Sequence, residues 1–222
     1  MAAVRKRISD AAKSMGRSEE EILLLPAVKY ASAEEINYLV KEHGVRAVGE
    51  NRVNTLLEHY EKTDNSKLEY HFIGSLQKNK VKYIYDKISL LHSLDSLSLA
   101  EEIEKRCARA DRVLDCLVEI NIAREESKGG VMPECAEEFS KELLKFEHVN
   151  VKGFMTMAPA GCSYEEYNDY FSSATELMKK LWKNIFKKEG EPLISMGMSA
   201  SLECAIANGS GCVRIGSDIF RH

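Results

Sequence analysis

The feature that most constrains the fold of this chain is a regular alternation of short apolar runs and segments with helical spacing. Apolar runs lie near residues 22–30, 46–50, 70–74, 88–93, 113–120, 151–157, 193–197 and 211–216. Helical patterns are expected before the first run and at 32–44, 53–60, 78–85, 98–108, 133–145, 164–188 and 200–207. A short apolar run next to an amphipathic helix is typical of a buried parallel strand. Eight such units in series predict an α/β fold, a single (β/α)8 TIM barrel.

An open, doubly wound sheet is the alternative arrangement for alternating strands and helices. The barrel is favoured because the strand count is eight and no glycine-rich dinucleotide fingerprint follows the first strand. The length of 222 residues suits one domain that spans residues 1–222. Ser32-x-x-Glu35 and Ser163-x-x-Glu166 are capping boxes that predict two helix starts.

Composition and charge exclude several classes of function. The net charge of −4 and the pI near 5.9 offer no basic surface for nucleic acid or for an anionic membrane. No apolar stretch approaches the roughly 20 residues that a membrane span requires, and the first residues lack the apolar core of a signal peptide. The six cysteines form no CxxC pair, and the histidines lack metal-ligand spacing. We therefore expect a cytoplasmic protein with reduced thiols and no metal site.

Lys29 has the clearest chemical potential in the sequence. It closes the first apolar run, at the end of the strand where barrels of this kind place their active sites. An amine in desolvated surroundings loses proton affinity and can become a nucleophile that forms Schiff bases. Taken by itself, the same lysine could also be a strand-end side chain that extends into solvent.

A second group of candidates follows the last two strands. Arg214 lies inside the eighth apolar run, and a buried guanidinium needs an acceptor, which could be a core carboxylate, a phosphate or a ligand atom. Ser199 follows the seventh run and is expected to cap the helix at 200–207. Gly216 and Ser217 follow the eighth run, where backbone N–H groups can approach an anion. The loops after strands seven and eight are the usual phosphate site of this barrel.

A Schiff-base lysine and a phosphate site on one barrel mouth suit two kinds of protein. One is a class I aldolase that acts on a sugar phosphate, and the other is a protein that binds pyridoxal 5′-phosphate (PLP). The positions of these residues distinguish only weakly between an aldolase and a PLP-binding protein. Arg214 is placed to meet a ring nitrogen across the mouth from the first strand.

Six short motifs, three of which contain these candidates, occur in order along the chain. They are Val28-Lys29, Gly49-Glu50-Asn51-Arg52, His71-Phe72-Ile73-Gly74-Ser75-Leu76-Gln77-x-Asn79-Lys80, Gly153-Phe154-Met155-Thr156-Met157, Ser195-Met196-Gly197-Met198-Ser199 and Val213-Arg214-Ile215-Gly216. Together they closely resemble the pyridoxal-phosphate homeostasis protein family, relatives of the barrel domain of alanine racemase. The resemblance covers essentially the whole chain. One difference is Ser201, at a position where the family usually has an acidic residue.

The resemblance implies a fold-type III PLP barrel with an alanine-racemase N-terminal-domain-like architecture. Lys29 would bind the cofactor as a Schiff base, and Arg214 would face the pyridine nitrogen. Ser199, Gly216 and Ser217 would hold the phosphate.

Two further residues, Asn51 and His71, match family motifs near the cofactor and complete the set of cofactor-binding candidates. The function implied is intracellular PLP (vitamin B6) homeostasis, with no catalytic residue assigned. Apo forms of PLP-dependent enzymes are the candidate recipients of the cofactor, and the protein is expected to be a monomer.

An amino-acid racemase is the alternative function. Racemisation needs an acid and a base on opposite faces of the substrate. In alanine racemase the acid–base group on the face opposite the lysine is a tyrosine from another domain. This chain, in contrast, ends within a few residues of the eighth strand. A cation beside the pyridine nitrogen also weakens the ring as an electron sink. We therefore expect a PLP carrier without robust catalysis.

Overall fold

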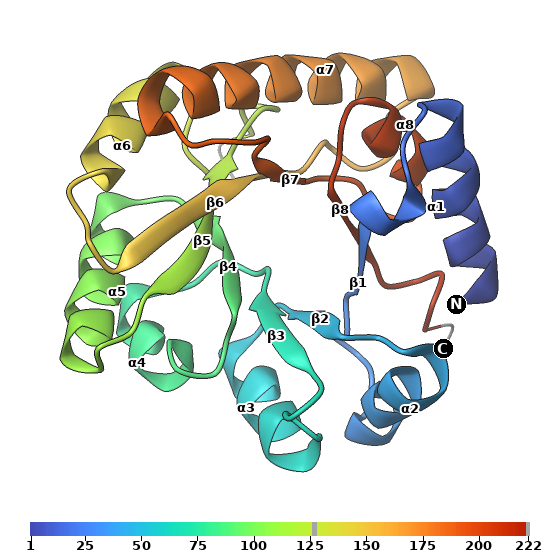
Figure 1. The fold of residues 1–222 in the computed structure, drawn as a ribbon, viewed down its shortest axis with the longest axis horizontal. Helices are drawn as coiled ribbons and strands as arrows, with labels where there is room; N and C mark the ends of the chain where they lie inside the picture. Colours follow the sequence, from blue (N-terminus) through green and yellow to red (C-terminus); the bar gives the residue numbers. More distant parts are fainter. Residues whose placement is uncertain (126–127, 221–222) are drawn as a thin grey trace.

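Eight strands form one parallel sheet that is surrounded by helices (Figure 1). The structure is a computed structural model, and it describes residues 1–125 and 128–220. The strands are β1 (Leu23–Pro26), β2 (Ala47–Glu50), β3 (Glu69–Phe72), β4 (Leu90–Leu94), β5 (Leu114–Ile120), β6 (Val149–Thr156), β7 (Leu193–Ser195) and β8 (Cys212–Ile215). All eight predicted strands are confirmed.

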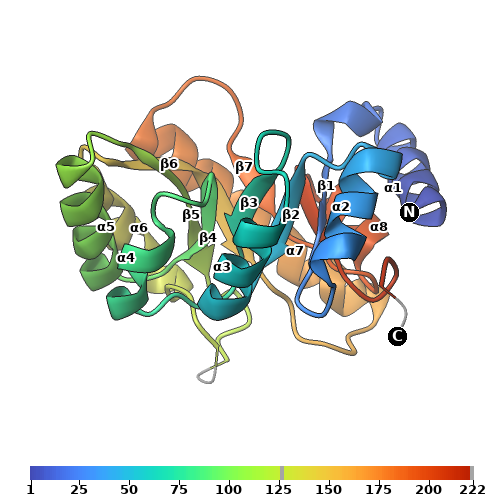
Figure 2. The ribbon, with the colours of Figure 1, turned by 90° about the horizontal axis from the view of Figure 1, so that it is seen from below.

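The order of the strands closes the sheet into a (β/α)8 barrel. The sheet runs β1-β8-β7-β6-β5-β4-β3-β2, and every pairing is parallel. A bridge between Ala27 and Gly49, with a hydrogen bond of 3.0 Å from Val28 N–H to the Gly49 carbonyl, joins the first strand to the second. The predicted barrel is therefore confirmed, and the carboxyl ends of all eight strands face one mouth. The loops after β5, β6 and β8 extend toward the same, lower side of the molecule in Figure 2.

The helices form the outer ring of the barrel. They are α1 (Ala2–Ser14), α2 (Ala33–His43), α3 (Val53–Lys62), α4 (Val81–Ile84), α5 (Leu97–Arg109), α6 (Ala136–Leu143), α7 (Tyr164–Leu181) and α8 (Leu202–Ala207). Both predicted capping boxes are confirmed, at Ser32 and Ser163. Within the described ranges, no helix combines the length and the apolar character needed to cross a bilayer.

The long helix α7 ends earlier than predicted. The long helix expected to reach residue 188 is regular only to Leu181, because a π-helical turn, Trp182–Phe186, follows and Lys187 adopts a left-handed backbone. This turn brings Trp182 and Phe186 against Phe154 of β6, with ring centroids 6.5 and 6.0 Å away. Packing onto the barrel thus decides how this helix ends.

The inside of the barrel contains both apolar and polar side chains. Apolar residues from alternate strand positions form small clusters there, such as Leu25 with Ile73 and Leu117 with Met155. Between these clusters lie buried polar side chains from four strands: His71, His92, Ser195 and Arg214. Buried polar groups cost free energy unless they are hydrogen-bonded, so their partners indicate how this barrel is organised.

Candidate functional site

A cavity of about 450 Å³ opens at the mouth of the barrel, above β1, β2, β7 and β8. Six of the seven candidate residues line it: Lys29, Asn51, Ser199, Arg214, Gly216 and Ser217. They come from four separate segments of the chain, which the barrel closure brings together. The seventh candidate, His71, is not among the residues that line the cavity.

Lys29 lies three residues beyond β1, in a turn that the β1–β2 bridge holds in place. Its side chain is only partly buried, so the desolvated surroundings expected for it are not seen here. The Lys29 Nζ lies 4.7 Å from the ring centroid of Tyr30, which is exposed at the rim. A hydrogen bond from the Lys29 ammonium, together with its charge, lowers the pKa of Tyr30. The amine is thus presented at the cavity wall, within reach of a ligand.

Arg214 is 5% exposed and forms part of the cavity floor. Its guanidinium donates hydrogen bonds to Ser195 Oγ at 2.6 Å and to the Thr156 carbonyl at 3.1 Å. Within residues 1–125 and 128–220, no carboxylate forms an ion pair with it. A guanidinium has five N–H donors, so this arrangement leaves donors available toward the cavity.

His71 lies beneath the cavity and is linked to Arg214 through two other buried residues. His71 Nδ1 is 3.1 Å from His92 Nε2, and His92 Nδ1 is 3.0 Å from Ser195 Oγ, which accepts the Arg214 hydrogen bond. Burial, together with the neighbouring His71 and Arg214 side chains, holds the pKa of His92 well below its usual range. His92 is therefore neutral, and one of its ring nitrogens is an acceptor. His71 is thus connected to the cavity-lining Arg214 only indirectly, through His92 and Ser195.

The Gly49-Glu50-Asn51 motif is explained by packing at the ends of β2 and β3. Glu50 is fully buried, and its carboxylate accepts the Asn51 backbone N–H at 3.0 Å and contacts His59 Nδ1 at 2.7 Å. Burial raises the pKa of Glu50, while His59 acts in the opposite direction. A Cβ at Gly74 would lie 2.2 Å from the Asn51 carbonyl oxygen, so only glycine fits there. These contacts fix the turn that places Asn51 at the cavity.

The loops after β7 and β8 place two hydroxyl groups side by side. Ser217 Oγ donates a hydrogen bond to Ser199 Oγ at 3.1 Å. The prediction that Ser199 caps the following helix is wrong, because α8 begins at Leu202 and its N-cap residue is Ser201. Ser201 Oγ instead accepts the Met198 backbone N–H at 3.2 Å, which stabilises the loop. The Ser199 hydroxyl is consequently free of a capping role and lies beside Ser217.

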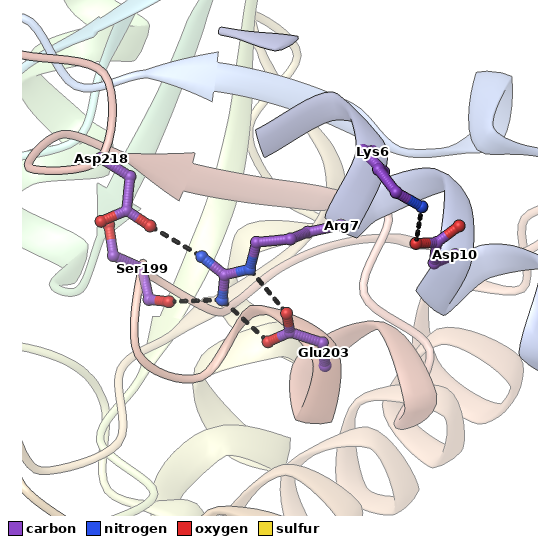
Figure 3. Close-up of polar contacts among 6 residues, drawn as sticks. All are labelled: Lys6, Arg7, Asp10, Ser199, Glu203 and Asp218. Atoms are coloured by element: carbon purple, nitrogen blue, oxygen red, sulfur yellow. Dashed lines mark hydrogen bonds and ion pairs between the residues drawn. The ribbon is translucent and has the colours of Figure 1, made fainter. Parts of the chain in front are cut away.

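Arg7, which the sequence did not single out, connects these two loops (Figure 3). From α1 it donates to the Ser199 carbonyl at 2.8 Å and forms ion pairs with Glu203 at 2.6 Å and Asp218 at 2.7 Å. No motif marks Arg7, since it lies on the polar face of an ordinary amphipathic helix. Only the packing of α1 beside α8 reveals that it holds the loops together.

In the part of the chain that the structure describes, no three His, Cys, Asp or Glu side chains are grouped so that they could hold a metal ion. The cavity instead combines an amine, a buried cation, an amide and two hydroxyl groups. This donor set suits an anionic organic ligand that carries a carbonyl group and a phosphate.

Comparison with known proteins places the chain in a family. The model of the family described as "Alanine racemase, N-terminal domain" matches residues 1–222. The pyridoxal phosphate homeostasis protein of Aquifex aeolicus is 41% identical over 217 residues, which cover 98% of this chain and 94% of the relative. The protein of the same name from Escherichia coli K12 is 33% identical over 223 residues, which cover 99% of this chain and 94% of the relative.

Solved structures agree with this placement. PipY of Synechococcus elongatus, solved with PLP bound, superposes with a TM-score of 0.83 at 26% identity, over 96% of this chain and 99% of PipY. An alanine racemase of Clostridium difficile superposes with a TM-score of 0.78 at 18% identity, over 98% of this chain but 55% of the racemase, and shows the fold alone. The chain therefore belongs to the pyridoxal phosphate homeostasis protein family, whose barrel is that of the alanine racemase N-terminal domain.

Proposed function

We propose that this protein binds PLP in the mouth cavity as a Schiff base with Lys29, and that it stores and delivers the cofactor in the cell without robust catalysis. The observation that carries the proposal is the convergence of Lys29, Arg214 and the Ser199–Ser217 pair on one cavity. PipY, which has this fold, was solved with PLP bound.

Each part of the cofactor has a matching group in the cavity. When bound, the cofactor supplies an aldehyde carbon with which the Lys29 amine can bond. The Ser199 and Ser217 hydroxyls, with the backbone around Gly216, would hold the phosphate. Arg214 would meet the pyridine nitrogen from the cavity floor.

Two features favour a carrier over a racemase. Arg214 is a fixed cation, which disfavours protonation of a nearby ring nitrogen and so weakens the ring as an electron sink. Tyr30 lies beside the Lys29 amine, with its ring centroid 4.7 Å from Nζ, and not across the cavity from it. A second acid–base group on the opposite face of a substrate, which racemisation requires, is not supplied by Tyr30.

Titration with PLP, followed by visible absorption, tests the binding proposal. The unmodified protein should develop the absorption band of a lysine Schiff base, and Lys29→Ala should not. Lys80→Ala, a lysine outside the cavity lining, is the matched control and should behave as the unmodified protein. An unchanged band in Lys29→Ala would overturn the assignment.

The phosphate site is tested with pyridoxal, which lacks the phosphate. Pyridoxal should bind at least about tenfold more weakly than PLP, since charge-assisted hydrogen bonds contribute about 1.5–3 kcal/mol. The double variant Ser199→Ala/Ser217→Ala should reduce this difference. Equal affinities of the unmodified protein for the two compounds would contradict the phosphate site.

The carrier role requires a separate experiment. We expect the loaded protein to restore activity to an apo PLP-dependent enzyme, and to exchange the α-hydrogen of alanine in heavy water only slowly. Exchange with inversion at about 10 per second, an ordinary enzymatic rate, would make the protein a racemase.

A further inference from the structure

A second cavity, of about 540 Å³, lies beside the first at the mouth of the barrel. Met157 and Met198 line both cavities, so the two are neighbours that share a wall of methionine side chains. Glu119 of β5, Pro159 and Tyr170 contribute to the rest of the lining. None of the seven cofactor-binding candidates belongs to this second cavity.

Glu119 is the unusual residue of the second cavity. Its side chain lines the cavity although the residue is 5% exposed. Among the described residues, no hydrogen bond or ion pair uses its carboxylate, whereas its backbone pairs with β6 and its carbonyl accepts the Val131 N–H at 2.8 Å. Its carboxylate oxygens are also not among the buried side-chain atoms that lack a partner, so the carboxylate faces the cavity and is available to a hydrogen-bond donor that enters it.

The charges around Glu119 restrict what the ligand can be. A Cβ at Gly129 would lie 3.3 Å from Asp95 Oδ2 and 3.6 Å from Glu119 Oε2, so two carboxyl groups flank this point. Arg214, which lines the first cavity, is the cation that acts on Glu119, while exposed Lys128 and partly exposed Glu125 also line the second cavity. Burial and the charge of Asp95 raise the pKa of Glu119 to about 7 against the opposing effect of Arg214. Two acidic groups at one end disfavour an anion and favour a cation or a hydrogen-bond donor.

We propose that the second cavity binds a small primary amine, with its ammonium group on Glu119 and its aliphatic part against Met157 and Met198. A charge-assisted hydrogen bond would satisfy the buried carboxylate. Methionine side chains are flexible and polarisable, so they accommodate aliphatic groups of different shapes. The amine would lie next to bound PLP, and only this position beside the cofactor rests on the proposed function.

The test uses the full-length protein after borohydride treatment, which reduces any Schiff base and prevents the probe from exchanging with it. The probe is n-butylamine, and n-butanol and butyrate are the comparison compounds. Binding is followed by the NMR signals of ¹³C-methyl-labelled methionines. Butylamine should shift the Met157 and Met198 methyl signals, and it should bind at least about tenfold more tightly than butanol or butyrate.

Two variants and one control complete the test. Glu119→Gln keeps the shape and removes the charge, and should lower the affinity for butylamine at least about tenfold. Gly129→Ala, which places a methyl group between the carboxyl groups of Asp95 and Glu119, should also weaken binding and is the second variant if Glu119→Gln folds poorly. Glu137→Gln changes the same charge on the exposed face of α6 and should bind as the unmodified protein.

Binding of butanol as tight as that of butylamine, or unchanged butylamine affinity in both Glu119→Gln and Gly129→Ala, would overturn the proposal. Because borohydride has no effect on a protein without a Schiff base, this result does not depend on whether PLP binds at Lys29. Failure of the amine site and failure of the PLP site are thus distinguishable.

Discussion

At the scale of single residues, the environment of Glu119 favours its neutral form. Its pKa is raised to about 7 from an ordinary value of 4.5, mainly by burial. The folded protein therefore binds this proton more tightly than the unfolded chain does. Stability contributed by the neutral carboxyl is complete below about pH 4.5 and is lost as the pH rises through 7.

The loss of stability with rising pH gives a prediction for Glu119→Gln, since glutamine resembles the neutral acid at every pH. The variant should be close to the unmodified protein in stability at pH 5 and more stable by about 2–3 kcal/mol at pH 8.5. Urea unfolding at the two pH values measures the difference. The same difference at both pH values would show that the charge of Glu119 is not the cause.

Ser195 is a second residue whose contribution can be measured. Its hydroxyl contacts both Arg214 and His92, so Ser195→Ala removes one partner from each of two buried groups. Loss of a buried partner costs about 1–3 kcal/mol. We expect the free energy of unfolding to fall by this amount. The absorption band of bound PLP should also shift, because Arg214 loses its hydrogen bond to Ser195 Oγ. Ser89→Ala, which removes a longer and only part-buried hydrogen bond to the Tyr70 carbonyl at 3.3 Å, is the control and should change neither quantity by a similar amount. An unaltered Ser195→Ala protein would contradict this account of Arg214.

At the scale of elements, α1 contributes to the mouth although its sequence shows no functional motif. Arg7 joins α1 to Glu203 of α8 and to Asp218 beyond β8, and so holds the two loops that carry Ser199 and Ser217 (Figure 3). Within the described part of the chain, Lys6, its neighbour on the same helix, forms an exposed ion pair with Asp10. The two adjacent cations therefore differ in what they stabilise.

The expected consequence is a difference between Arg7→Ala and Lys6→Ala. Arg7→Ala should weaken PLP binding about tenfold, because the phosphate loops lose several charge-assisted hydrogen bonds, and should affect pyridoxal binding less. Lys6→Ala should bind both compounds as the unmodified protein does, since an exposed ion pair contributes about 0–1 kcal/mol. Equal losses for PLP and pyridoxal would mean that Arg7 supports the whole barrel and not the phosphate loops.

The same elements show what can be predicted from the sequence. Apolar periodicity predicted all eight strands, because each parallel strand is buried on both faces and leaves a short apolar run. Local patterns were less informative where tertiary contacts decide the outcome. Ser201 and not Ser199 is the N-cap residue of α8, and the π turn after Leu181 arises where Trp182 packs on Phe154. Arg7 left no signal, since its role depends on neighbours far away in the chain. Glu119 is a charged residue inside the apolar run 113–120, the same kind of signal that marked Arg214, but it was not singled out.

At the scale of the whole molecule, the barrel brings the candidate residues together. Lys29 and Arg214 are separated by most of the sequence, yet β1 and β8 are neighbours in the sheet, with Leu25 paired to Arg214. Closure of the barrel by the bridge from Ala27 to Gly49 adds Asn51 to the same cavity. The central claim, that Lys29 binds PLP there, thus depends on the closed barrel and not on any single motif.

The most direct test of this claim is reduction of the PLP-loaded protein with borohydride, followed by proteolysis and mass spectrometry of the peptides. The account predicts loss of the visible absorption band and one pyridoxyl adduct, on the peptide that contains Lys29. An adduct mainly on another lysine, such as Lys80 or Lys128, or no adduct at all, would contradict it.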